Sequence, residues 1–333
     1  MKVAGPDAPR SFPSAALEMA RPSIPETMPA PSRGSMTRGL LVSLRPSQWI
    51  KNLVVLLALL FGQRLTHLPS VLHALAAFVI FCALSGVVYL INDVADREAD
   101  RRHPVKCRRP IASGAVPVRA ALTLAAVLAA AALAAAFALR PLFGVIALSY
   151  LVLLALYSGP LKHIVIIDVL TIAIGFVLRA AAGAVAIEVA FGAWLYMLTI
   201  LLSLFLALSK RRHELVLLAQ GATGHRRILE EYSPYLLDQM ISVVTASTLV
   251  AYAIFTVSPD TIAKFHTDRL GLTLPFPLYG IFRYLYLVHL KEGGGSPSDT
   301  LLADKPLLSC VALWALVVAL LIYGPSQLLH WNW

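Results

Sequence analysis

Long hydrophobic runs, separated by short polar turns, extend along most of this chain. A helix needs about 20 apolar residues to cross the hydrocarbon core of a bilayer, and no alternating apolar and polar pattern indicates the strands of a barrel. The pattern therefore predicts an all-α, polytopic membrane protein with nine transmembrane helices. The weakest of the nine is the first, because charged residues stand near both of its ends. The predicted helices cover residues 50–66, 69–91, 117–138, 141–158, 164–187, 191–209, 237–257, 273–290 and 307–328.

Composition agrees with this class. Of the 333 residues, 58% are hydrophobic and 14% are charged, and the mean hydropathy is +0.75. A soluble domain cannot bury that much apolar surface. The three cysteines, Cys82, Cys107 and Cys310, are scattered and form no CxxC or Cys/His cluster. Neither a disulfide framework nor a zinc site is therefore expected.

Basic residues are distributed unevenly between the two sides of the predicted bundle. With a cytoplasmic N-terminus, the inside connections carry 22 Lys and Arg residues and the outside connections carry four. This asymmetry predicts a multi-pass protein of the cytoplasmic (inner) membrane, with its N-terminus inside and its C-terminus outside. It also accounts for the net charge of +10 without nucleic acid as a partner. Contact with anionic lipid explains only part of the basic excess.

The chain is expected to contain two parts. Residues 1–36 are rich in proline and lack the apolar core of a signal peptide, so they predict a disordered N-terminal arm. Residues 37–333 form the predicted transmembrane domain.

Acidic residues crowd the end of the second predicted helix. Asn92, Asp96 and Asp100 are spaced four residues apart, so a helix that continues past the membrane places them in one column, with Asp93 on its edge. Oxygen donors without His or Cys favour Mg²⁺, which binds one or two carboxylates together with substrate phosphates. The alternative is a solvated helix end in which these acids pair with neighbouring arginines. Acids at a membrane boundary favour the functional interpretation.

Cations surround this motif on the predicted cytoplasmic side, as a magnesium diphosphate ligand requires. Arg179 lies inside a predicted helix among small residues, and its depth favours an anion over snorkelling or over Asp168, which is about 16 Å away along one helix. Tyr89 is either part of the same pocket or an interfacial anchor. The other candidate cations are Lys51, Lys106, Arg109, Lys162, Lys210 and Arg211.

These residues resemble the UbiA superfamily of intramembrane prenyltransferases, which carry an NDxxDxxxD motif after the second of nine helices. Asn92, Asp93, Asp96 and Asp100 match that motif position for position. The family's second acidic motif is replaced by the basic stretch LALSKRRHELVLL. Together with RPSQWIKN, SGPLKH, DVLTIAIGFVLRAAAGA and GGGSPSDTLLADKPLL, this resembles the decaprenyl-phosphate phosphoribosyltransferase branch.

The resemblance implies an enzyme that moves a 5-phosphoribosyl group from phosphoribosyl diphosphate (PRPP) to polyprenyl phosphate for envelope glycan precursors. It implies Mg²⁺ at Asn92, Asp93, Asp96 and Asp100. Asp93, Asp96 and Lys106 are the candidate catalytic residues. Lys51, Tyr89, Lys106 and Arg109 are expected to contact PRPP. Four further cations are expected to bind either the 5-phosphate of PRPP or the lipid phosphate, and the resemblance does not say which of them binds which phosphate. They are Lys162, Arg179, Lys210 and Arg211.

Two other functions stay open at this point. One is a prenyltransferase that joins a prenyl diphosphate to an aromatic acceptor, and the other is a transporter of lipids or small molecules. The oligomeric state, including a homo-oligomer, is also open.

Overall fold

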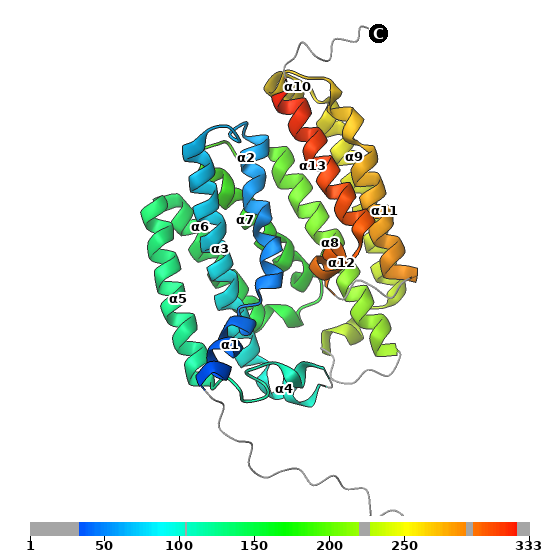
Figure 1. Ribbon diagram of the computed structural model, residues 1–333. Coiled ribbons are helices and arrows are strands. Elements are labelled where there is room, and N and C mark those ends of the chain that lie inside the picture. The colour runs from blue at the N-terminus through cyan, green and yellow to red at the C-terminus, as the bar shows by residue number, and fades with distance from the viewer. Residues whose placement is uncertain (1–32, 104, 220–226, 291–295, 325–333) are drawn as a thin grey trace, which may run out of the picture.

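The long helices lie side by side in one elongated bundle (Figure 1). The computed structural model describes residues 33–103, 105–219, 227–290 and 296–324, and every regular element within these ranges is a helix. The predicted all-α class is confirmed. Residues 1–32 of the predicted N-terminal arm lie outside the described residues, whereas residues 33–36 belong to the first helix, α1 (Arg33–Ser43).

Four long helices form the first half of the bundle. Proline marks their starts where a free backbone N–H is not needed, as at Pro69 and Pro141. His67 accepts a hydrogen bond from the backbone N–H of Ser70 and so caps the first of them. The four helices are α3 (Leu68–Ala95), α5 (Val118–Leu139), α6 (Pro141–Ser158) and α7 (Ile167–Ala186).

Four more long helices form the second half. Ser233 accepts a hydrogen bond from the N–H of Leu236, and Asp304 accepts one from Leu307, so side-chain oxygens cap two of these helices. The four are α8 (Ala193–Ala219), α9 (Pro234–Val257), α11 (Pro275–Leu290) and α13 (Lys305–Tyr323). Short helices connect the long ones: α4 (Arg97–Arg102), η3 (Lys106–Arg108), η4 (Leu161–His163), η5 (Arg227–Glu231), α10 (Pro259–Phe265), η6 (Arg269–Thr273) and α12 (Pro297–Ala303).

Eight helical segments of the described chain have the length and hydropathy to cross a membrane. They include every predicted span except 273–290. Its counterpart α11 has 16 residues, and these cover about 24 Å at 1.5 Å per residue. The prediction of nine helices is therefore close, and the shorter helix α11 stands where the eighth predicted span, 273–290, was expected.

The first span is irregular. It continues from α1 through the 3₁₀ helix η2 (Pro46–Leu56) into the short helix α2 (Leu57–Phe61), and Arg45 before η2 has a left-handed conformation with φ of 51°. A Cβ on Gly183 of α7 would lie 2.0 Å from the carbonyl oxygen of Val55. The glycine therefore lets η2 pack directly on the backbone of α7, as the small residues of that stretch predict.

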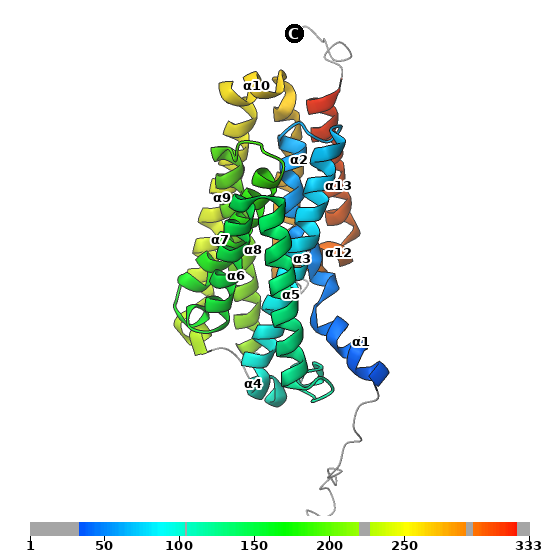
Figure 2. The ribbon, with the colours of Figure 1, turned by 90° about the vertical axis from the view of Figure 1, so that its left-hand side faces the viewer.

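Apolar packing is divided between the two halves. Phe81, Phe143 and Tyr150 belong to the first core, and Phe205 and Tyr284 to the second. Figure 2 shows that α10 and the C-terminal end of α13 lie at one end of the bundle, while α1 and α4 lie at the other. The acidic motif on α3 and α4 is therefore confined to one end.

Arg283 of α11 holds the start of α13. Its Nη2 and Nε donate to the carboxylate of Asp304 over 2.8 and 3.2 Å, so Arg283 has a protein partner rather than a lipid headgroup. This hydrogen bond lowers the pKa of the Asp304 carboxyl from its ordinary value.

The Arg283–Asp304 pair predicts a specific dependence of stability on pH. Because the folded pKa of Asp304 is lowered, its contribution is present above the ordinary pKa of about 4 and is lost as pH falls through the folded value. Wild-type protein is expected to melt at a higher temperature than Arg283→Gln at pH 7, and this difference should shrink toward pH 3. Thermal unfolding of both proteins in detergent between these pH values is the measurement. An unchanged difference would contradict the assignment.

Candidate active site

The acidic motif NDVADREAD spans a bend at the end of α3. That helix ends at Ala95, and α4 begins after Asp96, whose φ and ψ are −89° and 3°. The sequence predicted one continuous helix with Asn92, Asp96 and Asp100 in a single column. The continuous helix is wrong, because α3 ends at Ala95 and a separate short helix carries Asp100. Asn92 still donates to Oδ2 of Asp96 over 3.1 Å, as their four-residue spacing predicts.

Two arginines hold the buried carboxylate of Asp93. Nη2 of Arg45 lies 2.5 Å from its Oδ1, and Nη1 of Arg109 lies 3.1 Å from the same oxygen. Arg109 also donates to Oδ2 of Asp100 over 2.6 Å, so one guanidinium joins two carboxylates of the motif. The pairing with Arg109 places this predicted substrate-binding cation at the motif.

Asp96 has a different cation. Its Oδ1 lies 2.6 Å from Nζ of Lys162, and its Oδ2 accepts a hydrogen bond from Asn92 over 3.1 Å. The Lys162 side chain is buried and lies on η4, in the connection between α6 and α7. Lys162 is therefore brought to the acidic motif from a distant part of the chain, and its contact with the 5-phosphate or the lipid phosphate stays a prediction.

A second group of cations lies beside the first. Lys51 of η2 interacts electrostatically with Lys210, Arg179, Arg45 and Asp299. The Arg45 guanidinium stacks on the ring of Tyr89 at 4.8 Å. The structure therefore gathers four predicted substrate-binding residues, Lys51, Tyr89, Arg179 and Lys210, next to the motif.

Arg179 is buried inside the bundle, and no carboxylate in the described part of the chain pairs with it. Its Nε donates to Oδ1 of Asn52 over 2.8 Å, Nη2 donates to the hydroxyl of Tyr150 over 2.6 Å, and Nη1 donates to the carbonyl of Gly175 over 3.2 Å. Every one of these acceptors is neutral. A buried arginine whose hydrogen-bond acceptors are neutral groups is suited to an anionic ligand.

Arg211 is not presented to the acidic motif. Its side chain is 0% exposed, and its Nε lies 3.0 Å from Oδ2 of Asp168. It also pairs with Glu214 and donates to the hydroxyl of Tyr157 over 3.2 Å. Arg211 was expected to receive a phosphate, but carboxylates and a phenol surround it instead. Its role at a phosphate stays a prediction.

Lys106 lies on η3, three residues before Arg109. Its backbone N–H donates to Nδ1 of His103 over 3.3 Å, which fixes the turn after α4. Its catalytic and substrate-binding roles stay predictions.

The model of the UbiA prenyltransferase family matches residues 52–298. The chain belongs to the UbiA prenyltransferase family. The resemblance seen in the sequence is thereby confirmed.

Individual relatives agree with the family. Decaprenyl-phosphate phosphoribosyltransferase of Corynebacterium glutamicum is 32% identical over 304 residues, which are 87% of this chain and 88% of that protein. The Mycobacterium tuberculosis protein of the same name is 32% identical over 299 residues, 87% of this chain and 96% of its own. The fold is similar to that of a UbiA homologue from Archaeoglobus fulgidus bound to GPP and Mg²⁺. The TM-score is 0.66 at 20% identity, over 85% of this chain and 99% of that one.

The UbiA-family motif suits a divalent cation by its donor chemistry. Within the described parts of the chain, no three His, Cys, Asp or Glu side chains converge as ligands for one metal ion. Mg²⁺ usually takes only one or two protein carboxylates and completes its shell with water and substrate phosphates, so a cage of three acids is not required. The hard oxygens of Asn92, Asp93, Asp96 and Asp100 fit that donor set. The same A. fulgidus homologue has also been solved with Cd²⁺ bound.

Several residues of this UbiA-family site were missed in the sequence. The sequence assigned no site role to Arg45 or Asn52. Gln48 and Asp299 were also missed, although Gln48 donates to Oδ1 of Asp299 over 3.2 Å and so joins η2 to α12. Arg45, Gln48 and Asn52 all lie in the RPSQWIKN stretch, and Asp299 lies in GGGSPSDTLLADKPLL. The signal for these residues was therefore the family resemblance that the two stretches carry.

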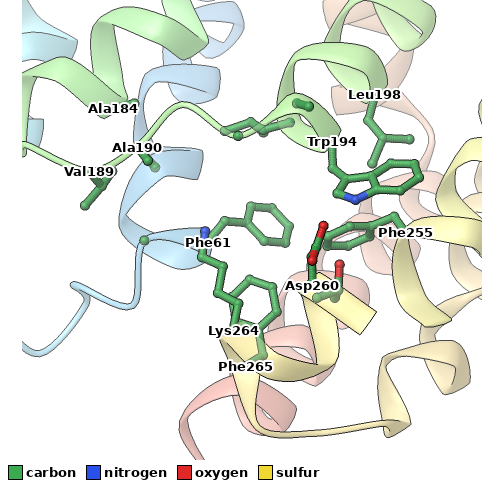
Figure 3. A pocket seen from close by; sticks show the side chains of 16 residues that line it. Phe61, Ala184, Val189, Ala190, Trp194, Leu198, Phe255, Asp260, Lys264 and Phe265 are labelled. Carbon is green, nitrogen blue, oxygen red and sulfur yellow. The ribbon is translucent and has the colours of Figure 1, made fainter. Parts of the chain in front are cut away.

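A cavity of about 280 Å³ lies at the other end of the bundle, near α10. Figure 3 shows aromatic side chains around it, with Asp260 and Lys264 on the α10 side. It lies at the end opposite to α4 and the acidic motif. The UbiA-family chemistry therefore points to the motif rather than to this cavity.

Proposed function

We propose that this chain transfers a 5-phosphoribosyl group from PRPP to a polyprenyl phosphate and releases diphosphate. The relatives that cover 87% of the chain at 32% identity are decaprenyl-phosphate phosphoribosyltransferases. The observation that carries the proposal is the meeting of carboxylates and cations at one end of a membrane bundle. Two groups of cations lie there, one on the acidic motif and one beside it. The product enters the synthesis of envelope glycan precursors.

The acidic motif is the diphosphate site of this proposal. Arg45 and Arg109 on Asp93, and Lys162 on Asp96, supply donors for diphosphate oxygens. Mg²⁺ held by Asn92, Asp93, Asp96 and Asp100 would neutralise charge on the departing diphosphate. The carboxylates thus serve the metal, and the cations that pair with them serve the phosphates.

The second group of cations is the site for the lipid phosphate. Arg179 is buried within α7, a membrane-spanning helix, and Lys51 and Lys210 lie within electrostatic range of one another. A lipid that enters from the bilayer brings its phosphate to this depth. Lys51, Arg179 and Lys210 therefore balance the charge of the acceptor while its tail stays among the helices.

The reaction needs orientation more than proton transfer. An oxygen of the lipid phosphate attacks C1 of the ribosyl group, and the bond from C1 to the diphosphate oxygen breaks. That phosphate oxygen is already ionised at neutral pH, so no general base is required. The side chains align two anions that otherwise repel each other, and they stabilise the charge that moves onto diphosphate.

The proposal includes the orientation of the chain. PRPP is water-soluble and cytosolic, so the end of the bundle with α1 and α4 faces the cytoplasm of the inner membrane, and the C-terminus lies outside. The excess of Lys and Arg residues on the connections at that end supports this orientation.

The two other functions have less support. A prenyltransferase of aromatic acceptors needs acids after the sixth predicted span, but Lys210, Arg211 and Arg212 of α8 occupy that stretch. These cations interact with Glu214, Asp168 and Asp238 of the protein. A transporter needs charges at mid-bilayer in both halves, whereas the carboxylates of the acidic motif and the cations that pair with them concentrate at one end.

Mass spectrometry of lipid products tests the proposal. Purified protein with PRPP, Mg²⁺ and decaprenyl phosphate is expected to form a lipid heavier by one phosphoribosyl group, with one diphosphate released per product. EDTA should abolish the product, because without Mg²⁺ the two anionic substrates lose the positive charge that brings them together. Added Mg²⁺ should restore the product.

Two matched incubations complete this test. In the first, geranyl diphosphate and 4-hydroxybenzoate replace PRPP and decaprenyl phosphate. In the second, the protein is placed in liposomes loaded with labelled PRPP, and movement of the label across the membrane is measured. Prenylated acceptor without ribosylated lipid would favour the aromatic alternative. Movement of unchanged substrate alone would favour a transporter.

A further inference from the structure

The position of Lys162 depends on the connection between α6 and α7. Its buried ammonium lies 2.6 Å from Oδ1 of Asp96, yet Lys162 itself sits in a single 3₁₀ turn, η4, outside any long helix. Such a short turn does not fix a side chain by itself. Other contacts must hold the turn against the end of α3.

One of these contacts is at the α7 side of the turn. Ile166 has φ of 67°, a left-handed conformation that a β-branched residue rarely adopts. Its backbone N–H donates to the hydroxyl of Tyr232 over 2.7 Å, and that hydroxyl donates to Oδ1 of Asp168 over 2.9 Å. Tyr232 follows η5, more than sixty positions along the chain, so this hydrogen bond joins the two halves of the bundle.

The other contact is at the α6 side. Tyr157, in the last turn of α6, accepts a hydrogen bond from Nη2 of Arg211 over 3.2 Å. The Nε atom of the same arginine lies 3.0 Å from Oδ2 of Asp168, as an ion pair rather than an aligned hydrogen bond. Arg211 therefore reaches both ends of the turn, one directly and the other through Asp168 and Tyr232.

We propose that Arg211 and Tyr232 are positioning residues that hold the 159–166 turn so that Lys162 meets Asp96. The inference rests on the proposed function through the role of Lys162 at the diphosphate. It assigns Arg211 a task different from phosphate binding, and it assigns Tyr232 a role that the sequence did not indicate.

The ionisation of Tyr232 is consistent with this geometry. Burial raises its pKa to about 12, so the hydroxyl stays protonated across the working range of pH. A protonated hydroxyl donates to Asp168 and accepts from Ile166 at the same time.

Tyr232→Phe tests the contact itself, because it removes the hydroxyl and keeps the ring. Tyr284→Phe is the matched control, since the Tyr284 hydroxyl is also buried and has no hydrogen-bond partner in the structure. Hydrogen–deuterium exchange on full-length protein in detergent should become faster in peptides that contain Ile166 in Tyr232→Phe and stay at the wild-type rate in Tyr284→Phe. Equal exchange in both variants would overturn the inference. This readout does not depend on the substrate.

The activity arm tests the link to Lys162. With PRPP, Tyr232→Phe should lower kcat/KM roughly ten- to a hundredfold, as misplacement of a site residue does, and Tyr284→Phe should leave it unchanged. Added to Lys162→Ala, Tyr232→Phe should cause little further loss, because the residue it positions is gone. Equal losses on both backgrounds would overturn the inference.

Two further results separate this inference from the proposed function. Arg211→Lys keeps the charge and is expected to retain more activity than Arg211→Gln. A wild-type protein without phosphoribosyl transfer would refute the proposed function, and the exchange measurement would then decide whether Tyr232 holds the turn.

Discussion

Asp93→Asn is expected to lower kcat/KM for PRPP by two to three orders of magnitude, about the effect of removing one group that stabilises the transition state. The substitution keeps the shape of the side chain and removes its charge. Asp93 is buried and touches both Arg45 and Arg109, so its loss weakens metal binding and frees two guanidiniums from their shared anchor. A radiochemical assay with labelled PRPP at several Mg²⁺ concentrations measures the effect, and higher Mg²⁺ should recover part of the activity.

Glu98→Gln is the matched control for that variant. Glu98 lies in the same acidic motif, but its side chain is 67% exposed, and its ion pairs among the described residues are with Arg97 and Arg101. Exposed pairs of this kind contribute little, so the control should keep wild-type kinetics. If both variants retained full activity, the diphosphate site would not be at this motif. If both lost activity equally, a general charge effect would replace the specific role of Asp93.

Arg179→Met is expected to lower activity about a hundredfold while leaving the melting temperature unchanged or higher. The reason is that Arg179 is a buried cation with neutral partners only, namely Asn52, Tyr150 and the carbonyl of Gly175. Its burial costs free energy of folding, and a bound phosphate would offset that cost. A change that harms catalysis without harming stability is the mark of a ligand site rather than of a structural contact.

The comparison for Arg179 is Arg140→Met. Arg140 precedes α6, pairs with Glu188 and donates to the carbonyl of Ala186 over 3.2 Å. Its replacement should cost some stability and no activity. Thermal unfolding together with KM for polyprenyl phosphate separates the two positions. A large drop in melting temperature for Arg179→Met, with an unchanged KM, would mean that this arginine only supports the fold.

The sequence determined the class of protein and the place of its chemistry. Membrane spans are local, because each helix satisfies its own backbone hydrogen bonds and must be long and apolar enough for the bilayer. Eight of the nine predicted spans recur for that reason. The acidic motif at the end of α3 was equally visible, because an ionisable residue within a membrane-spanning helix, such as Asp93, rarely lacks a function.

Tertiary structure decided which cation meets which acid. Arg45 and Asp93 are 48 positions apart, and Lys162 and Asp96 are 66 positions apart. No periodicity in the sequence predicts such pairs, because they depend on how separate helices pack. The bend at Asp96 and the burial of Arg211 have the same origin. The local sequence around an arginine that follows a membrane span is the same whether its guanidinium binds a phosphate or an aspartate. Only the packing of α7, α8 and the η5 connection assigns Arg211 to Asp168.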